Sequence, residues 1–303
     1  GERAEHKGMV KPQSAKRLGT SHRGAGTALS PGTKRLNARA GLTVDGEHLE
    51  NLIEKASRNG FDTGEVVTSS LTNAIPAAFL AHQPDRHMEE EIALDIAYSP
   101  ADVLFGGGTA KFEKRKDGRN LSEEMCGRGY RVVKEFGELA DITNGRIVGL
   151  FAENNLPGMR SGRGDYLPRA TAKALDVLSN NSEQGFLLMI EGSLIDGASH
   201  NNNIEAVIRE TVDFDEAVGV AFDYADRHKG TLVIVVADHE TGGLTIASYG
   251  KDYSMTDGVK FTEGGHSSTL VPVYAYGPGA ENFTGIIDNT QIAYKIARLL
   301  AVN

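Results

Sequence analysis

The hydrophobic and polar positions of this chain follow two different periods along the sequence. Apolar residues spaced three and four apart predict amphipathic helices, and short β-branched or continuous apolar runs predict strands buried on both faces. Helices are predicted at residues 48–59, 89–99, 167–179 and 203–228, and strands at residues 64–70, 101–108, 146–152, 185–193 and 231–240. Because helices and buried strands alternate, the pattern predicts an α/β sandwich in which helices cover a sheet.

Two parts of the chain depart from this alternation. Residues 110–145 are polar and irregular in pattern, which indicates an insertion or a small accessory element. Residues 1–40 are rich in lysine and arginine, whereas residues 41–303 carry the acidic excess that gives the whole chain a net charge of −9. The composition therefore divides the chain into a basic N-terminal segment, 1–40, and a main domain, 41–303.

Length, charge and cysteine content exclude several classes of protein. With 303 residues, of which 40% are hydrophobic, the chain can bury a substantial core. Its negative net charge disfavours non-specific binding to nucleic acid. The single cysteine, Cys126, rules out an internal disulfide framework and a CxxC zinc motif. No apolar run approaches the roughly 20 residues that span a bilayer, and the N-terminus lacks the apolar stretch of a secretory signal.

The strand predicted at residues 231–240 ends in polar chemistry. A β-branched run leads directly into Asp238 and His239, and Gly242 and Gly243 follow. Open α/β sheets bind ligands at the carboxyl ends of their strands, and two glycines allow the turn that would bring both side chains to one ligand. An ordinary strand followed by a polar turn would give the same letters, so the weight of this motif depends on the rest of the chain.

A second strand end, in the sequence LLMIEGSLIDGASH, offers the same donor types. Glu191 closes the predicted strand, and Asp196 and His200 follow four residues apart. On a helix that spacing places both side chains on one face, where they can chelate one divalent ion. Carboxylate oxygen and imidazole nitrogen suit Zn²⁺, whereas a lone carboxylate such as Glu191 suits Mg²⁺. An exposed Asp-His pair is the simpler alternative, but the recurrence of the pattern at Asp238 favours a metal site.

His266 opens a third motif, GGHSSTLVPVYAYGPGA. Two glycines precede it and an apolar strand follows. A histidine beside glycines at the mouth of a strand is often a plain loop residue. Taken with the other two motifs, however, it completes a set of oxygen and nitrogen donors sufficient for two or three metal ions. We therefore expect Asp196, His200 and His266 to converge on one ion.

The same strand ends predict how the sheet is arranged. Glu191, Asp238 and His239 can share one crevice if their strands lie side by side with the carboxyl ends at the same edge. We therefore expect the strands ending at Ser69, Glu191 and Asp238 to belong to one central sheet.

These motifs resemble those of a known family. MIEGSLIDGASH, ADHETGG and GGHSSTLVPVYAYGPGA look like the metal-binding motifs of the alkaline phosphatases in order and spacing, and the similarity runs from about Gly24 to the C-terminus. The resemblance implies a three-layer α/β/α sandwich around a mixed, mostly parallel sheet, with two zinc ions and one magnesium ion. By this likeness the first zinc would be bound by Asp196, His200 and His266, the second by Asp238 and His239, and the magnesium by Glu191.

The resemblance also implies a reaction. AHQPDRHMEEEIA resembles the segment that carries the family's phosphate-binding arginine, which falls on Arg86, and a guanidinium can hold two phosphate oxygens at once. The implied function is hydrolysis of phosphomonoesters through a covalent phosphoserine, with zinc activating the serine and stabilising the leaving oxygen. Phosphomonoesters and inorganic phosphate are then the ligands. A homodimer exported to the periplasm or the medium is the implied form.

The N-terminal part departs from the family pattern. The family's nucleophile lies in an Asp-Ser-Ala-Ala run before a Thr-Ala pair, which this chain retains in GAGTALSPGTK. An ungapped count puts His22 at the nucleophile, and a one-residue insertion puts Ser21 there. The family threonine that helps to bind magnesium falls on Ile75, which offers no oxygen. Residues 1–19 hold no aspartate to match the one that bridges the second zinc and the magnesium.

Two explanations fit these departures. One is a truncated or frame-disrupted reading of an ordinary phosphatase gene, and the other is a protein that keeps the zinc site without turnover. We take metal-dependent phosphomonoester hydrolysis as the predicted function, with Ser21 and Arg86 as candidate catalytic residues, and expect low turnover from this chain. The alternative is a non-catalytic protein that binds zinc and phosphate. A phosphodiesterase or sulfatase of the same superfamily fits less well, because the Gly-His and Arg86 segments resemble phosphatases.

Overall fold

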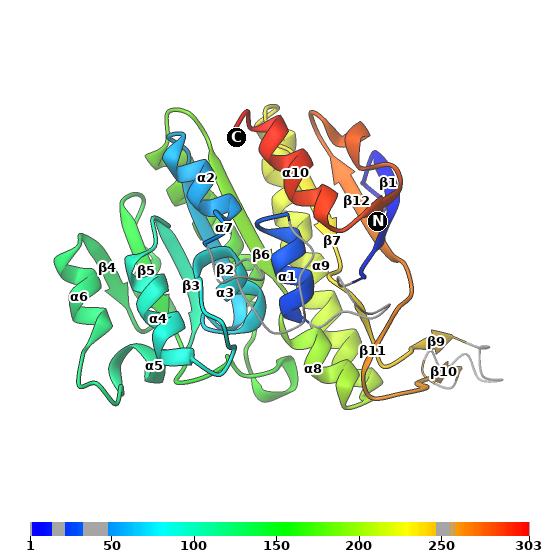
Figure 1. The fold of residues 1–303 in the computed structure, drawn as a ribbon, viewed down its shortest axis with the longest axis horizontal. Coiled ribbons are helices and arrows are strands. Elements are labelled where there is room, and N and C mark those ends of the chain that lie inside the picture. Colours follow the sequence, from blue (N-terminus) through cyan, green and yellow to red (C-terminus); the bar gives the residue numbers. More distant parts are fainter. Residues whose placement is uncertain (1, 14–21, 33–47, 247–255, 257, 303) are drawn as a thin grey trace.

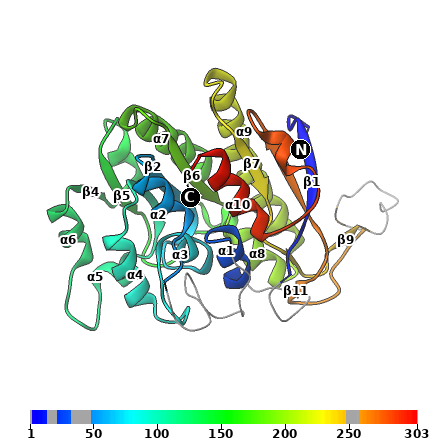
Figure 2. The same ribbon diagram turned by 45° about the horizontal axis from the view of Figure 1, so that its top comes forward.

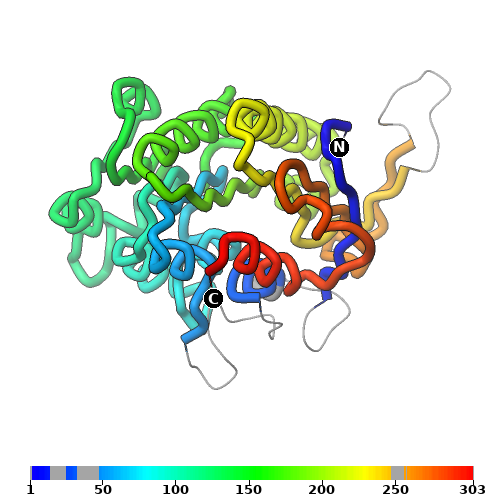
Figure 3. Tube along the Cα trace, turned by 90° about the horizontal axis from the view of Figure 1, so that it is seen from above, coloured from blue at the N-terminus to red at the C-terminus, as the bar shows by residue number. Residues whose placement is uncertain are grey.

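The described part of the computed structural model comprises residues 2–13, 22–32, 48–246, 256 and 258–302. Its strands form a middle layer with helices on both sides, as the view from above shows (Figure 3). One outer layer holds α7 (Tyr166–Asn181) and α9 (Ile204–Arg227), and the other holds α1 (His22–Leu29), α2 (Leu52–Arg58) and α10 (Thr290–Leu299). The predicted three-layer α/β sandwich is confirmed.

Five parallel strands form the larger of the two main sheets (Figure 1). Their order is β4 (Tyr130–Val133), β5 (Arg146–Leu150), β3 (Val103–Gly107), β2 (Asp62–Ser70) and β6 (Phe186–Glu191). Every neighbouring pair is parallel, so all five carboxyl ends meet at one edge of the sheet, where α/β proteins bind ligands. Val67 on β2 lies opposite Glu191 on β6, so Glu191 reaches that edge.

A second sheet of four strands continues the middle layer on the side of the N-terminus (Figure 1). Its order is β13 (Gly285–Asp288), β1 (His6–Lys11), β12 (Val271–Tyr276) and β7 (Val233–Val236). β1 runs parallel to β13 and antiparallel to β12, and β7 runs antiparallel to β12. Composition alone set residues 1–40 apart from the main domain, but β1 is an interior strand with Val10 buried. The composition of residues 1–40 did not predict this strand, because Met9 and Val10 are its only large apolar residues.

The strand that ends before Asp238 does not share a hydrogen-bonded sheet with the other two donor strands. β2 and β6 are neighbours in the five-stranded sheet, whereas β7 pairs with β12 in the four-stranded sheet. Figures 1 and 2 show β6 and β7 at the facing edges of the two sheets. The expectation of one central sheet for strands ending at Ser69, Glu191 and Asp238 is therefore wrong. An apolar run specifies burial, but it does not specify which strand provides the hydrogen bonds.

The predicted helices agree closely with the structure except at one N-terminus. The helix predicted at residues 48–59 begins later, at Leu52. The Asn51 side chain accepts a hydrogen bond from the Glu54 N–H, and the Glu54 carboxylate accepts one from the Asn51 N–H. This reciprocal capping box ends the preceding extended segment and starts α2. Three other helices lie where they were predicted, namely α4 (Glu89–Tyr98), α7 and α9.

The segment 110–145 is more regular than its sequence predicts. It contains β4, the edge strand of the five-stranded sheet, with Tyr130 and Val133 buried. An edge strand exposes many of its side chains, so a polar composition does not reveal it, and the sequence indicated only an insertion or a small accessory element. The other elements in or beside this segment are α5 (Thr109–Glu113), α6 (Leu121–Gly127) and a 3₁₀ helix at Phe136–Leu139.

Two apolar clusters fill the space between strands and helices. One includes Leu52 of α2, Ile92 of α4 and Phe283, and the other includes Phe105 of β3 and Leu167 of α7. Within the part of the chain that the structure describes, no helix has both the length and the apolar character to cross a bilayer. Other short elements include 3₁₀ helices at Met159–Ser161 and Ala280–Phe283 and the pair of two-residue strands β9 (Thr245–Ile246) and β10 (Val259–Lys260).

Glu65 is an acidic side chain in the interior of the five-stranded sheet. It lies on β2 between Leu104 of β3 and Met189 of β6, and it is fully buried. Neither carboxylate oxygen has a hydrogen-bond partner among the described residues. Burial raises the pKa of Glu65 well above its ordinary value, and the negative charge of Glu191 raises it further. A buried carboxyl group of this kind destabilises the fold, and most strongly when it is ionised.

Replacing this side chain with an apolar one tests that conclusion. We expect Glu65→Leu to raise the free energy of unfolding by about 1–3 kcal/mol at about pH 8. The folded-state pKa is raised, so the folded state binds more protons than the unfolded state. The wild-type chain therefore loses stability as the pH rises above the unfolded pKa of about 4.3 towards the folded value, and Glu65→Leu lacks this loss.

Guanidinium denaturation at about pH 5 and about pH 8 measures both effects. Glu65→Gln serves as the control, because it removes the pH dependence while leaving a buried polar group in place. An equal gain for Glu65→Leu at both pH values would contradict this reading of Glu65.

Candidate metal centre

Two short elements carry three of the candidate metal ligands, and a third short element pairs with one of them. α8 (Leu194–His200) follows the end of β6, so Asp196 and His200 lie one turn apart on a helix at the carboxyl edge of the sheet. His266 lies on β11 (His266–Ser267), which pairs antiparallel with β8 (Glu240–Thr241). His266 is opposite Thr241 in that pair, and this register brings the GGHSSTL motif beside the ADHETGG motif.

Asp196, His200 and His266 converge as the sequence predicts. The Nε2 atoms of His200 and His266 are 3.1 Å apart. Asp196 Oδ2 lies 3.2 Å from Nε2 of His200, and Asp196 Oδ1 lies 3.5 Å from Nε2 of His266. One ligand atom from each residue fits within 4.8 Å of the other two, a spacing that a single ion can bridge.

The orientation of the His200 ring favours a metal ion over a simple hydrogen bond. Its Nδ1 lies 2.6 Å from the carbonyl oxygen of Gly264, so this nitrogen carries the proton and donates. The Nε2 atom is then the unprotonated nitrogen of the ring, and it faces Asp196 and the Nε2 atom of His266. Histidines that bind metals are held in the same way, with the other ring nitrogen donating to a carbonyl or carboxylate. The donor set of one carboxylate and two imidazoles therefore fits zinc with a position left open.

Asp238 and His239 form the adjoining half of the centre. His239 Nε2 lies 3.0 Å from Asp238 Oδ2, and the His239 side chain is 1% exposed. The rings of His239 and His266 stack with centroids 3.6 Å apart and an angle of 19° between their planes. The ADHETGG motif thus lies directly against the triad, although β7 and β6 belong to different sheets.

Thr241 links the two halves, and sequence reasoning missed it. Its hydroxyl lies 2.5 Å from Asp196 Oδ1 and 3.1 Å from Nδ1 of His239. Asp196 is an acceptor, so the hydroxyl donates to it and can accept from His239. Thr241 stands two residues after His239 in ADHETGG. Its position inside that motif could have indicated a role at the metal centre. The sequence offered no reason to select a threonine, however, because the aspartate and histidine beside it are stronger metal ligands.

The remaining residues that the sequence singled out do not lie on the elements that carry the triad. Glu191 ends β6, where the Ser193 hydroxyl donates to its Oε2 at 2.6 Å. Arg86 is exposed in the loop between α3 (Ala74–Leu80) and α4. Ile75 is buried within α3. Ser21, the candidate nucleophile, lies outside the described residues.

The role of Thr241 can be tested by removing its hydroxyl. We expect Thr241→Val, which keeps the shape of the side chain, to weaken zinc binding by about 10-fold to 100-fold, the usual effect of losing a group that orients metal ligands. Competition with a chromogenic chelator measures this affinity. Thr245→Val is the matched control, because Thr245 is exposed on β9 and the one described hydrogen bond of its hydroxyl is to the Gly243 carbonyl. Equal zinc affinity in both variants would remove Thr241 from the centre.

A layered α/β fold with clustered carboxylate and imidazole donors beside the carboxyl ends of its strands is the architecture of a metal-dependent hydrolase. Comparison with known sequences makes this class specific. The sequence pattern of the alkaline phosphatases matches residues 2–257 and 245–302. The chain is 32% identical to alkaline phosphatase 3 of Bacillus subtilis, over 94% of this chain and 78% of that protein. It is 29% identical to the alkaline phosphatase of Escherichia coli K12, over 93% of this chain and 74% of that protein.

Solved structures give the same result. The alkaline phosphatase of the Antarctic bacterium TAB5 superimposes with a TM-score of 0.94 and 38% identity, covering 100% of this chain and 90% of that one. A variant of that enzyme with magnesium bound in its M3 site superimposes with a TM-score of 0.92 and 39% identity, with the same coverage. The chain belongs to the alkaline phosphatase family, whose members are phosphoric monoester hydrolases.

Proposed function

We propose that this chain is a metal-dependent phosphomonoester hydrolase of low turnover that works at the centre formed by α8, β8 and β11. The observation that carries the proposal is the convergence of Asp196, His200 and His266, whose donor atoms lie within 4.8 Å of one another. Phosphomonoesters are the substrate class and inorganic phosphate is the product. Family membership supports this substrate class.

Each candidate residue has a role that its position supports. Asp196, His200 and His266 would hold one zinc ion, and Asp238 and His239 would supply two ligands to a second. Glu191, whose carboxylate the Ser193 hydroxyl orients, would supply one ligand to magnesium. Zinc held at this centre would neutralise charge on phosphate oxygens and supply a nucleophilic hydroxide near neutral pH. Two zinc ions and one magnesium ion are the proposed complement.

Two residues of the chain would act on the substrate itself. Arg86 would bind two phosphate oxygens with its guanidinium group, and its exposed position on the loop before α4 leaves it accessible to a ligand. Ser21 would attack phosphorus and carry the phosphoryl group until water removes it. Thr27 and Ala28, which follow in the family's nucleophile segment, are buried in α1, as an anchored loop would require.

A second candidate function, non-catalytic binding of zinc and phosphate, is favoured by two observations. β1 precedes α1 in the chain, as the family's aspartate-bearing strand precedes the nucleophile, but residues 2–13 include no aspartate. Ile75 is buried in α3 where the family's magnesium-binding threonine falls, and its side chain has no oxygen to coordinate an ion. Both changes affect the second zinc and the magnesium, and they leave the first zinc triad unchanged.

One paired measurement separates the two functions. Zinc content by atomic absorption and hydrolysis of p-nitrophenyl phosphate at alkaline pH are measured on the same preparation. Bound zinc with slow hydrolysis that stops on chelation supports the hydrolase. Bound zinc without turnover supports the binding protein, and absence of zinc contradicts both. Export to the periplasm or medium and assembly as a homodimer remain proposals that rest on the family resemblance alone.

A further inference from the structure

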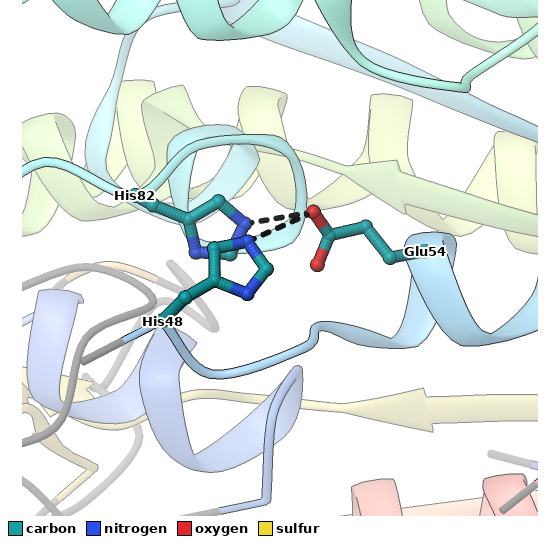
Figure 4. Close-up of side chains that lie close together, drawn as sticks. All are labelled: His48, Glu54 and His82. Atoms are coloured by element: carbon teal, nitrogen blue, oxygen red, sulfur yellow. Dashed lines mark hydrogen bonds and ion pairs between the residues drawn. The ribbon is translucent and has the colours of Figure 1, made fainter.

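A second group of metal-binding side chains lies outside the catalytic candidates. His48 stands before α2, Glu54 lies in the first turn of α2, and His82 lies just after α3 (Figure 4). Donor atoms of all three, one from each residue, fit within 4.8 Å of one another. Three separate segments of the chain therefore direct two imidazoles and a carboxylate to one point.

The distances define the centre of this group. Glu54 Oε1 lies 2.9 Å from Nε2 of His82 and 3.3 Å from Nε2 of His48. The two imidazole rings are 3.6 Å apart between centroids, with 40° between their planes. Both Nε2 atoms thus face the same carboxylate oxygen, as Figure 4 shows. Two protonated imidazoles this close would repel each other, whereas two neutral imidazoles can share a cation with the carboxylate.

Other contacts hold these groups in position. The second carboxylate oxygen of Glu54, Oε2, accepts the Asn51 N–H in the capping box, which leaves Oε1 for the histidines. The backbone N–H of His82 donates to Asp95 Oδ2 at 2.9 Å, which fixes the start of its loop. The Asn51 side-chain nitrogen lies 3.5 Å from Nε2 of His82, at the limit of a hydrogen bond. Two of the three donors are therefore positioned by contacts that metal binding would leave intact.

Charge and exposure also suit a bound cation. Glu54 is the acidic member of the group, and its carboxylate can balance part of the charge of a divalent cation. The His82 and Glu54 side chains are 14% and 22% exposed, whereas His48 is 57% exposed. The cluster is thus partly desolvated, with one side open to solvent for entry of an ion and for a water ligand.

We propose that His48, Glu54 and His82 form a zinc site separate from the catalytic centre. Two imidazoles and one carboxylate with an open fourth position are a donor set that zinc adopts in proteins. The site joins the segment before α2 to the loop after α3, so bound zinc stabilises this side of the fold. It does not depend on the proposed hydrolytic function.

The test uses the full chain in a background that lacks the first catalytic zinc ligands, Asp196→Asn with His266→Gln. Zinc content after equilibration with zinc and gel filtration, and the absorption bands of bound cobalt, are compared with and without further substitutions. We expect His82→Gln or Glu54→Gln to remove about one equivalent of zinc and to abolish the increase in melting temperature that zinc produces. Glu54→Gln keeps an oxygen that can accept the Asn51 N–H, so the helix cap is retained.

His87→Gln is the matched control, because His87 is exposed in the same loop and its N–H bonds to Asp85. It is expected to bind as much zinc as the background. The proposal is overturned if His82→Gln and Glu54→Gln retain the same zinc content as the control. It is also overturned if these variants melt at lower temperature without metal while zinc stabilises none of the proteins, since the three side chains would then be only a hydrogen-bonded group.

Discussion

Replacing Asp196 with asparagine is expected to weaken zinc binding at the first zinc position by more than about 100-fold. Losing a group that merely orients a ligand already costs roughly 10-fold to 100-fold in metal affinity, and Asp196 is itself a proposed ligand. Its carboxylate lies within 3.5 Å of both histidines of the triad and also accepts the Thr241 hydroxyl. An amide carries no negative charge and has only one oxygen, so it holds the cation weakly. The two facing imidazoles are then left without a carboxylate to share the ion.

The same substitution is expected to reduce hydrolysis of p-nitrophenyl phosphate to the background rate, because phosphate binding at this centre depends on the cation. Titration with zinc in the presence of a competing chelator gives the affinity, and initial rates at saturating zinc give the activity. Asp215→Asn is the control, since it removes one negative charge from an exposed position on α9. Similar losses in both variants would mean that net charge, and not ligation by Asp196, governs the effect.

Two members of the triad were predictable because they are close together in sequence. Asp196 and His200 are four residues apart, and α8 turns that spacing into a shared face. The histidine at position 266 is distant in sequence, and only the pairing of β8 with β11 brings it to the triad. The presence of the other two motifs in the same chain predicted the convergence. The sequence of residues 240–267, however, contains no pattern that predicts the pairing of β8 with β11. Thr241 shows the same limit, since it gains its role from contacts with Asp196 and His239.

The layers were also predictable, because alternating helical and strand periods specify an α/β fold. The sheet arrangement was not. Apolar runs predicted that β6 and β7 are buried on both faces, but their residues are only partly buried, packed against the two apolar clusters. The choice of β2 and β12 as their partners is made by contacts across long separations in sequence. β1 was not predicted for a related reason. This six-residue strand has only two large apolar side chains, so its pairing with β12 and β13 stabilises it and its own composition does not.

Restoring the family's N-terminal chemistry is expected to raise turnover on the order of 1,000-fold or more, since removal of a catalytic nucleophile costs at least that much in hydrolases that use one. The variant replaces residues 6–21 with a strand that ends in aspartate and with an Asp-Ser-Ala-Ala loop, and it adds Ile75→Thr. The new aspartate would provide a charged ligand for the second zinc beside Asp238 and His239, and the threonine would provide an oxygen for magnesium beside Glu191.

The matched control carries the same graft with alanine in place of the new serine, so that folding and metal content stay constant while the nucleophile is absent. Steady-state hydrolysis at alkaline pH, with zinc and magnesium added, compares the parent, the graft and the alanine control. High turnover in the graft alone would assign the defect of the parent chain to its nucleophile and N-terminal ligands. Equal and high turnover in the parent and the graft would instead show that residues 1–40 already contain a working nucleophile. In that case Ser21 would be the first residue to replace, with loss of the phosphorylated enzyme intermediate as the measured outcome.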